Sequence, residues 1–376
     1  MPENPELIIT ELTKATHIYF TVTNDLVFDQ RMRRICNSLS GAGYFVTLVG
    51  RQYGDSPVTE MEKYRQVRLH CYFRKGRAFY AEFNIRLFLY LFFSKIDIIC
   101  AIDLDTILPC LLVSRAKGIT RIYDAHELFC EMKEIVSRPG IYRYWKTVEK
   151  WAVPHFHQGY TISDPIAQEF EKNYGVHYSV IRNLPCKQVE LDTGTNEGFI
   201  LYQGAVNEGR SFETLIPAMI EAEANLLICG DGNFTDQARA LVKKYKLEDK
   251  IIFKGMLRPV DLRIYTQKAK IGLTLFENTG KSNYYSLANR FFDYIQAGLP
   301  QICVDYPAYR TINEQFNVAL LIPDLEPHTI ACALNNLLQD DVLYEELHEN
   351  CLKARDYLNW EEEEKKLLFF YNQLSS

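Results

Sequence analysis

Short apolar runs rich in β-branched and aromatic residues alternate with longer segments of helical periodicity along the whole chain. Runs of this kind, bounded by polar residues, predict buried strands, and strands separated by helices predict parallel sheets. In the first half the predicted strands are His17–Val22, Phe45–Val49, Ile96–Ala101, Arg121–Asp124 and Gln158–Ile162. In the second half they are Phe199–Gln203, Ala224–Cys229, Ile251–Lys254, Ile271–Leu275 and Gln301–Val304. The pattern therefore predicts an α/β protein with doubly wound sheets.

A polar, turn-rich stretch from Cys186 to Gly198 separates the two sets of strands. We interpret it as an interdomain linker. The chain is then expected to form two Rossmann-like domains, residues 1–185 and 199–355, joined by residues 186–198 and followed by a C-terminal helix within 356–376. Trp360–Leu374 has the amphipathic pattern of that helix. Because ligands bind at the carboxyl ends of the strands in such folds, the two domains should face a cleft.

Composition narrows the class of function. The chain is 47% hydrophobic and 24% charged, as expected of a globular protein, and its net charge of -6 argues against general nucleic-acid binding. Its ten cysteines show neither a Cys-x-x-Cys pair nor zinc-like spacing, which suits a reducing compartment and predicts no metal site. The N-terminal residues lack an apolar signal region, and the longest apolar run, Leu87–Phe93, is far shorter than the roughly 20 residues of a membrane span. We therefore expect a cytoplasmic protein.

The segment Lys281–Tyr306 carries the most specific chemistry. A polar loop leads into a helix with Arg290 and Asp293, the helix stops at Gly298, and a buried strand follows. A helix N-terminus offers free N–H groups to a diphosphate, Arg290 adds charge there, and Asp293 can accept hydrogen bonds from a ribose. The residues alone are equally compatible with a capped helix whose Arg and Asp face water.

This segment resembles the nucleotide-sugar site of the retaining glycosyltransferases of family 4, which have the GT-B fold. Asn289–Arg290 stands for the family's Asn-Lys, Phe292–Tyr294 for its aromatic-Glu-Tyr, and Ala297–Pro300 matches its Ala-Gly-Leu-Pro. Two carboxylates differ: Asp293 replaces a Glu, and Tyr285 stands where the family has the first of its paired Glu residues. The resemblance implies donor binding by Lys281, Tyr284, Tyr285, Ser286 and Asp293.

Glycine-containing turns extend the resemblance, although each alone would also fit a plain turn. Gly204 ends a strand, and Arg210 fills the second basic position of the family's Gly-Arg loop, whereas the first basic position is Ala205. Gly230 and Gly232 form a Gly-Asp-Gly turn, which lies near the nucleotide in the family. Gly255 and Arg258 fall where the family's base-binding loop lies.

In the first half, Tyr123–Leu128 resembles an Asp-x-His-Glu-like motif of the family. The resemblance places His126 beside the reacting sugar, so His126, Arg210 and Arg290 are the predicted catalytic residues, and Glu127 would orient either His126 or the acceptor. Asp103 and Asp105 follow the preceding strand. An Asp-x-Asp pair binds a metal in some transferases, but here we favour a role at the acceptor.

Two further segments of the first half have open interpretations. Asp25, Asp29 and Arg31 either line the acceptor side or form surface ion pairs. Residues 74–95 mix cations with apolar residues. They predict either a helix lying on anionic lipid or a half-buried helix packed against the first sheet.

The resemblance implies a retaining glycosyltransferase that moves a sugar from a nucleoside-diphosphate sugar to a hydroxyl of a glycan or lipid-linked acceptor. Such an enzyme would serve cell-surface or extracellular polysaccharide or glycoconjugate synthesis, without metal or cofactor, at most peripherally at the inner face of the membrane. It also implies that the last helix crosses back to the first, acceptor-side domain. No pair of carboxylates points to a glycosidase. A nucleotide-sugar epimerase of the same fold and a non-catalytic sugar-nucleotide-binding subunit remain alternatives.

Overall fold

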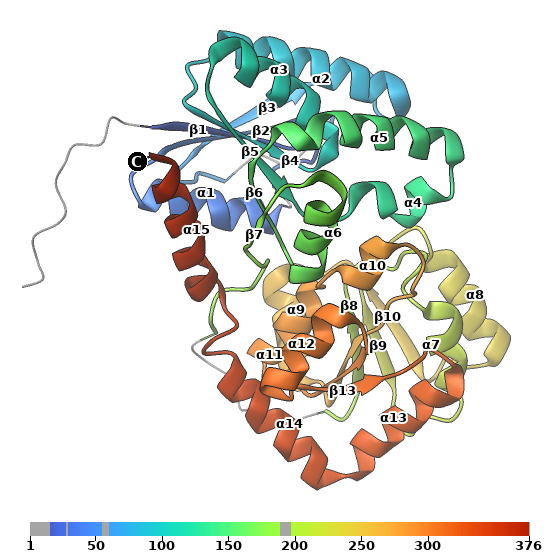
Figure 1. Ribbon diagram of the computed structural model, residues 1–376. Coiled ribbons are helices and arrows are strands. Elements are labelled where there is room, and N and C mark those ends of the chain that lie inside the picture. The colour runs from blue at the N-terminus through green and yellow to red at the C-terminus, as the bar shows by residue number, and fades with distance from the viewer. Residues whose placement is uncertain (1–15, 28, 55–59, 189–196, 376) are drawn as a thin grey trace, which may run out of the picture.

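The computed structural model describes residues 16–27, 29–54, 60–188 and 197–375, and it contains two α/β units stacked on one another (Figure 1). The first unit is built on a parallel sheet with the order β3-β2-β1-β4-β5-β6-β7. Its strands are β1 (His17–Thr21), β2 (Phe45–Gln52), β3 (Arg65–His70), β4 (Ile98–Ile102), β5 (Thr120–Ala125), β6 (Gln158–Thr161) and β7 (Ser179–Val180). Its helices are α1 (Gln30–Gly41), α2 (Gly76–Phe93), α3 (Ile107–Lys117), α4 (Lys133–Val136), α5 (Pro139–Ala152) and α6 (Asp164–Tyr174).

The second unit has a parallel sheet with the order β10-β9-β8-β11-β12-β13. Its strands are β8 (Ile200–Gln203), β9 (Leu226–Cys229), β10 (Ile251–Gly255), β11 (Ile271–Thr274), β12 (Gln301–Val304) and β13 (Ala319–Ile322). The helices from here on are α7 (Phe212–Ala218), α8 (Thr235–Tyr245), α9 (Pro259–Lys268), α10 (Lys281–Tyr285), α11 (Asn289–Gln296), α12 (Pro307–Phe316), α13 (Pro327–Gln339), α14 (Asp341–Ala354) and α15 (Trp360–Ser375). The predicted α/β class with two doubly wound sheets is confirmed.

Each strand expected from the apolar runs is present, and three further strands complete the sheets. The strand β3 is a half-buried edge strand with charged residues, β7 is only two residues long, and β13 is a short apolar run. The loop expected before α11 is partly helical, because Lys281–Tyr285 forms α10. The predicted linker lies largely in residues 189–196, outside the described part of the chain.

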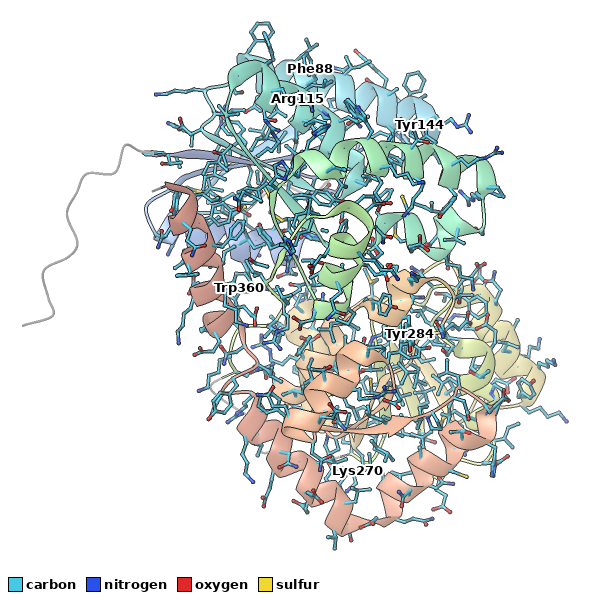
Figure 2. All side chains as sticks on the ribbon, in the orientation of Figure 1. Phe88, Arg115, Tyr144, Lys270, Tyr284 and Trp360 are labelled. Carbon is cyan, nitrogen blue, oxygen red and sulfur yellow. The ribbon has the colours of Figure 1, made fainter. Side chains whose placement is uncertain are left out.

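The last helix, α15, packs against α1 of the first unit, and Figure 1 shows it running up beside that unit. Trp360, at the start of α15 (Figure 2), donates from Nε1 to Oγ of Ser38 at 3.0 Å. Leu367 and Tyr371 are fully buried in one apolar cluster with Phe20 of β1. The core of the first unit therefore includes residues from the far end of the chain.

Phe79, Phe83, Leu87 and Leu91 of α2 point into the core of the first unit. The alternative of a half-buried helix packed on the first sheet is therefore correct for this face. No helix in the described ranges is long and apolar enough to cross a membrane.

Candidate active site in the interdomain cleft

A cavity of about 460 Å³ lies between the two units. The first unit contributes Arg31, His126 and Glu127 to its wall. The second unit contributes, among others, Gly204, Arg210, Phe276, Ser282, Asn283, Ser286, Arg290 and Asp293. A neighbouring cavity of about 390 Å³ shares Asp293 with the first. The structure thus brings the three predicted catalytic residues to one cleft.

Two arginines of the second unit hold positive charge in this cleft. The guanidinium of Arg290 lies 4.3 Å from the ring centre of Tyr202 and 4.8 Å from that of Phe276. Arg210 lies 4.4 Å from the same Phe276 ring. Neither arginine forms an ion pair with a described residue, and the buried Nη1 of Arg290 has no hydrogen-bond partner in the described structure. Burial and the charge of Arg290 lower the pKa of Arg210, so the pair favours an anion between or beside them.

Glycine allows the backbone to line the cavity next to these cations. Gly204 has a φ of 117°, and a Cβ there would lie 3.7 Å from Cζ of Arg290. At Gly230 a Cβ would collide with the carbonyl of Gly204, so the ends of β8 and β9 meet only because that residue has no side chain. Gly232 is packed in the same way against Val206. Gly204 therefore lines the cleft, whereas Gly230 and Gly232 support it from behind.

Asp293 of α11 is held in place by a short relay. Nε2 of Gln203 donates to Oδ2 of Asp293 at 3.0 Å, and Oγ1 of Thr266 donates to Oε1 of Gln203 at 2.8 Å. Burial raises the pKa of Asp293 to about 6. At neutral pH the group is therefore a carboxylate that can accept hydrogen bonds from a diol in either cavity.

His126 of the first unit lies between two carboxylates. Its Nε2 is 3.1 Å from Oδ2 of Asp124, and its Nδ1 is 3.8 Å from Oδ2 of Asp103. Burial alone would lower the pKa of His126, but Asp124 and Asp103 outweigh it and raise the pKa to about 9. Asp124 and Asp103 therefore favour the charged, hydrogen-donating form of the imidazole at neutral pH.

Arg31 holds Asp124 on the side of that carboxylate opposite His126. It donates to Oδ1 of Asp124 at 2.9 Å and to the carbonyl of Ile181 at 3.0 Å. Burial opposes ionisation of Asp124, yet Arg31 and His126 lower its pKa below the usual value. Arg31 thus keeps Asp124 charged, and Asp124 keeps His126 charged.

Asp103 has a strained backbone, with φ 53° and ψ 179°. A non-glycine residue in this region costs on the order of 1–3 kcal/mol, and such residues concentrate at functional sites. Its backbone N–H donates to the carbonyl of Asp124, and its Oδ1 accepts from the backbone N–H of His126 at 2.9 Å. The strained turn therefore fixes the start of the His126 loop.

Several predicted donor residues do not line the cleft. Arg258 precedes α9, its side chain is 82% exposed, and it pairs with Asp261. Gly255 ends β10 with open space around it. Lys281 forms an ion pair of 2.9 Å with Glu169 of the first unit. Arg258 pairs with Asp261 and Lys281 pairs with Glu169, so each side chain is held by a carboxylate outside the cleft wall.

The two tyrosines of α10 likewise pack between the units. The ring of Tyr284 (labelled in Figure 2) packs in a tilted arrangement against the rings of Tyr285 and Tyr306. The carbonyl of Tyr285 accepts a hydrogen bond of 2.7 Å from Oγ of Ser163 in the first unit. Ser286 does line the cavity, as do Asn283 and Ser282. The rings of α10 therefore join the units, and the polar residues around them face the cleft.

On the acceptor side the structure separates the predicted residues. Asp29 caps α1 by accepting from the backbone N–H of Met32 at 3.0 Å, and Asp25 lies 3.5 Å from Arg68, so neither lines the cleft. Glu127 does line it, with Ser282 Oγ at 3.5 Å. Asp105 accepts from Oγ1 of Thr23 and lines a separate pocket.

The site contains residues that were not predicted from the sequence, among them Asp124, Gln203 and Phe276. Asp124 belongs to the quoted His126 motif, but only the fold shows it between Arg31 and His126. Gln203 directly precedes Gly204 and ends β8. A polar residue at the carboxyl end of a strand in this fold could have been predicted to face the cleft. Nothing in the sequence marks Phe276 as a site residue. Its role depends on contacts with Arg210 and Arg290, which only the fold brings to the same ring.

Comparison with known proteins agrees with this arrangement. A model of the family described as "Glycosyl transferases group 1" matches residues 187–354, and a model of "Glycosyltransferase Family 4" matches residues 30–186. A curated protein of Campylobacter jejuni is 24% identical over 178 residues, which are 46% of each chain, so the alignment spans about half the length of that relative. It is described as N-acetylgalactosamine-N,N'-diacetylbacillosaminyl-diphospho-undecaprenol 4-alpha-N-acetylgalactosaminyltransferase.

Solved glycosyltransferase structures share the fold. Sucrose-phosphate synthase of Thermosynechococcus elongatus has a TM-score of 0.79 at 16% identity and covers 96% of this chain and 99% of its own. WaaG, a glycosyltransferase of lipopolysaccharide biosynthesis, has a TM-score of 0.72 at 15% identity, covering 93% and 98%. Anabaena HepE in complex with UDP-glucose has a TM-score of 0.73 at 10% identity, covering 95% and 99%. Since the two family models together span residues 30–354 and the architecture is the GT-B fold, the chain belongs to the group 1, family 4 glycosyltransferases.

Proposed function

We propose that this chain transfers a sugar, with retention of configuration, from a nucleoside-diphosphate sugar to a hydroxyl acceptor in the synthesis of a surface polysaccharide or glycoconjugate. The observation that carries the proposal is the pair Arg210 and Arg290, two cations without an acid partner in the described structure, set against Phe276. Asp293 lies on the same wall. A diphosphate beside the arginines and a ribose at Asp293 would fit this wall, and HepE is a structural neighbour that was solved with UDP-glucose.

The chemistry follows from these positions. The bond between the anomeric carbon and the diphosphate oxygen breaks, and the acceptor oxygen bonds to that carbon on the same face. The acceptor proton passes to an oxygen of the departing diphosphate. Arg210, Arg290 and the N-terminus of α11 stabilise the charge that develops on the leaving group. The imidazolium of His126 donates a hydrogen bond to the donor sugar or to the acceptor.

We further propose that the reaction needs no divalent metal, because two arginines supply the charge that a cation would bring to the diphosphate. The described residues contain no cluster of three or more His, Cys, Asp or Glu that could hold a metal ion. No cofactor beyond the sugar donor is invoked.

For the acceptor we propose a glycan or a lipid-linked sugar. The description of the Campylobacter jejuni relative includes a diphospho-undecaprenol-linked sugar, which is of this kind. We expect no nucleic-acid partner at a net charge of -6.

The test is release of nucleoside diphosphate from a panel of nucleotide sugars, with and without a chelator, followed by NMR of the anomeric product. We expect release that survives the chelator and is lost in Arg290→Ala but kept in Arg239→Ala, whose arginine stacks on Phe253 away from the cleft. An inverted product would refute retention, and loss with chelator restored by metal would refute metal independence.

Two other outcomes would replace the proposed reaction. Nucleotide-sugar binding without any turnover would indicate a non-catalytic binding subunit, which the Ala205 and Tyr285 departures make a meaningful alternative. Conversion of the nucleotide sugar into an isomer without an acceptor would indicate an epimerase.

A further inference from the structure

A further pocket, of about 650 Å³, opens in the first unit. It lies between α2, the start of α3 and α5, and Tyr144, on its α5 wall, is labelled in Figure 2. Asp105 forms part of its wall, two residues after the Asp103 that holds His126. Asp103 thus links this wall of the pocket to the loop that carries His126.

The lining of this pocket is mainly apolar and aromatic. The side chains that form it include Tyr80, Ala81, Leu104, Leu108, Ile141, Tyr144 and Trp145. Two of the polar groups in it have partners within the chain: Nδ2 of Asn84 donates to the carbonyls of Tyr80 and Asp105, and the Asp105 carboxylate accepts from Thr23. Because most of the lining is apolar or aromatic, the interior of the pocket favours an apolar guest.

Positive charge marks the mouth of the same pocket. Arg77 of α2 and Arg138, just before α5, both line it and both are exposed. Neither forms an ion pair with a described residue. Two unneutralised guanidiniums at the rim of an apolar pocket are complementary to a phosphate that is attached to an apolar chain.

The outer face of α2 continues from the pocket as an apolar stripe. Ala81 lines the pocket, and Ile85, Leu89 and Phe92 follow at helical spacing with exposed fractions of 62%, 49% and 42%. An apolar chain longer than the pocket would therefore leave it along apolar surface and not into water.

We propose that this pocket, defined by α2, the start of α3 and α5, binds the lipid part of the acceptor: an apolar chain joined through a phosphate to the sugar that receives the transferred residue. The chain would occupy the aromatic interior, the phosphate would pair with Arg77 and Arg138, and the sugar would extend past Asp105 toward His126. This inference rests on the proposed transferase function and specifies the acceptor class for it.

The test measures binding directly. Farnesyl phosphate is titrated calorimetrically into the full chain with saturating inorganic pyrophosphate, which occupies the Arg210 and Arg290 site. Ala81→Phe fills the pocket from an exposed helix position, and Ala78→Phe adds the same ring to an exposed position of α2 that does not line it. We expect Ala81→Phe to weaken farnesyl phosphate by about tenfold or more, because buried methylene groups are displaced, and Ala78→Phe to leave it unchanged.

Charge is tested separately from shape. Arg77→Glu should weaken farnesyl phosphate, while Arg143→Glu, at an exposed residue of α5 outside the pocket, should not. Absence of binding, or binding that Ala81→Phe leaves intact, would overturn the proposal. Displacement of farnesyl phosphate by a free oligosaccharide would also overturn it, in favour of a carbohydrate subsite.

The two proposals fail in different ways. Nucleoside-diphosphate affinity, measured on the same samples, should be equal in the native chain and in Ala81→Phe. If farnesyl phosphate binds as expected while no nucleotide sugar is turned over, the transferase proposal fails and the prenyl-phosphate pocket stands. If turnover is present and farnesyl phosphate does not bind, only the pocket proposal fails.

Discussion

At the residue scale, the site depends on charges that are stabilised by their neighbours. His126 remains an imidazolium because Asp124 and Asp103 lie on either side, and Asp124 remains ionised because Arg31 donates to it. On the opposite wall Arg210 and Arg290 have no such compensation. The charges of His126 and Asp124 are thus balanced within the first unit before a ligand binds, whereas the two arginines of the second unit favour an anion.

Asp293→Ala should weaken a nucleoside diphosphate by roughly 1.5–3 kcal/mol, the range for a hydrogen bond to a charged group. The reason is that Gln203 orients this carboxylate toward both cavities. Calorimetric titration measures the effect, and Asp261→Ala, at a surface ion pair outside both cavities, is the control. Unchanged affinity in a folded Asp293→Ala variant would refute the assignment.

His126→Ala should lower kcat by on the order of 10²-fold or more while nucleoside-diphosphate affinity stays nearly intact. Its ring lies on the first unit, across the cleft from the arginines that would hold the phosphates. Steady-state kinetics and calorimetry on the same variant separate the two effects. Normal turnover would make His126 structural, and lost nucleotide binding would place it on the phosphate side.

The raised pKa of His126 also predicts how stability depends on pH. A histidine pKa of about 9 in the folded chain, against about 6.5 when unfolded, gives stability that is complete below pH 6.5 and is lost as the pH rises through 9. The difference in unfolding free energy between the native chain and His126→Gln should therefore shrink between pH 6.5 and 9. Urea unfolding at several pH values measures it, and a difference that grows with pH would contradict the charge assignment.

At the scale of elements, apolar periodicity identified the strands whose residues are buried on both faces, such as β4 and β12. It did not identify β3, because an edge strand needs no continuous apolar run. The sequence alone pointed to Arg290 and Asp293 of the Lys281–Pro300 segment as site residues, and both line the cleft. The relay from Arg31 through Asp124 could not be predicted in this way, because Arg31 and Asp124 are 93 residues apart and only strand order brings them together.

The element whose loss should be most instructive is α15. Leu367→Ala should destabilise the chain by about 2–5 kcal/mol, because its side chain is fully buried against the first unit. Phe369→Ala, at a position 65% exposed on the same helix, should change stability by less than about 0.5 kcal/mol. Hydrogen exchange should show the Leu367→Ala effect in β1, and an effect confined to the second unit would contradict the packing.

At the scale of the whole molecule, one face of the first unit combines exposed apolar side chains with cations. Phe93 at the end of α2 is 83% exposed, and Arg74, Lys75 and Arg77 precede or begin the same helix. Such a face suits peripheral contact with an anionic membrane. It would direct the pocket between α2 and α5 toward lipid.

Phe93→Glu should therefore reduce co-sedimentation with anionic vesicles by about tenfold, the effect of removing one inserted aromatic side chain. Met256→Glu, which adds the same charge at a position 76% exposed on the second unit, should have no effect. Equal loss in both variants would show a net-charge effect, and no loss in either would exclude this face as the membrane contact.

The packing of α15 on the first unit also bears on how the chain is made. A ribosome delivers residues from the N-terminus at about 5–20 per second, and domains usually fold in that order. Here the core around Phe20 includes Leu367 and Tyr371, which emerge more than 340 residues later than that strand. The second unit can bury its own core before α15 is synthesised, whereas the core of the first unit stays incomplete until α15 packs against it. The half of the chain that is translated first is therefore the half that finishes folding last.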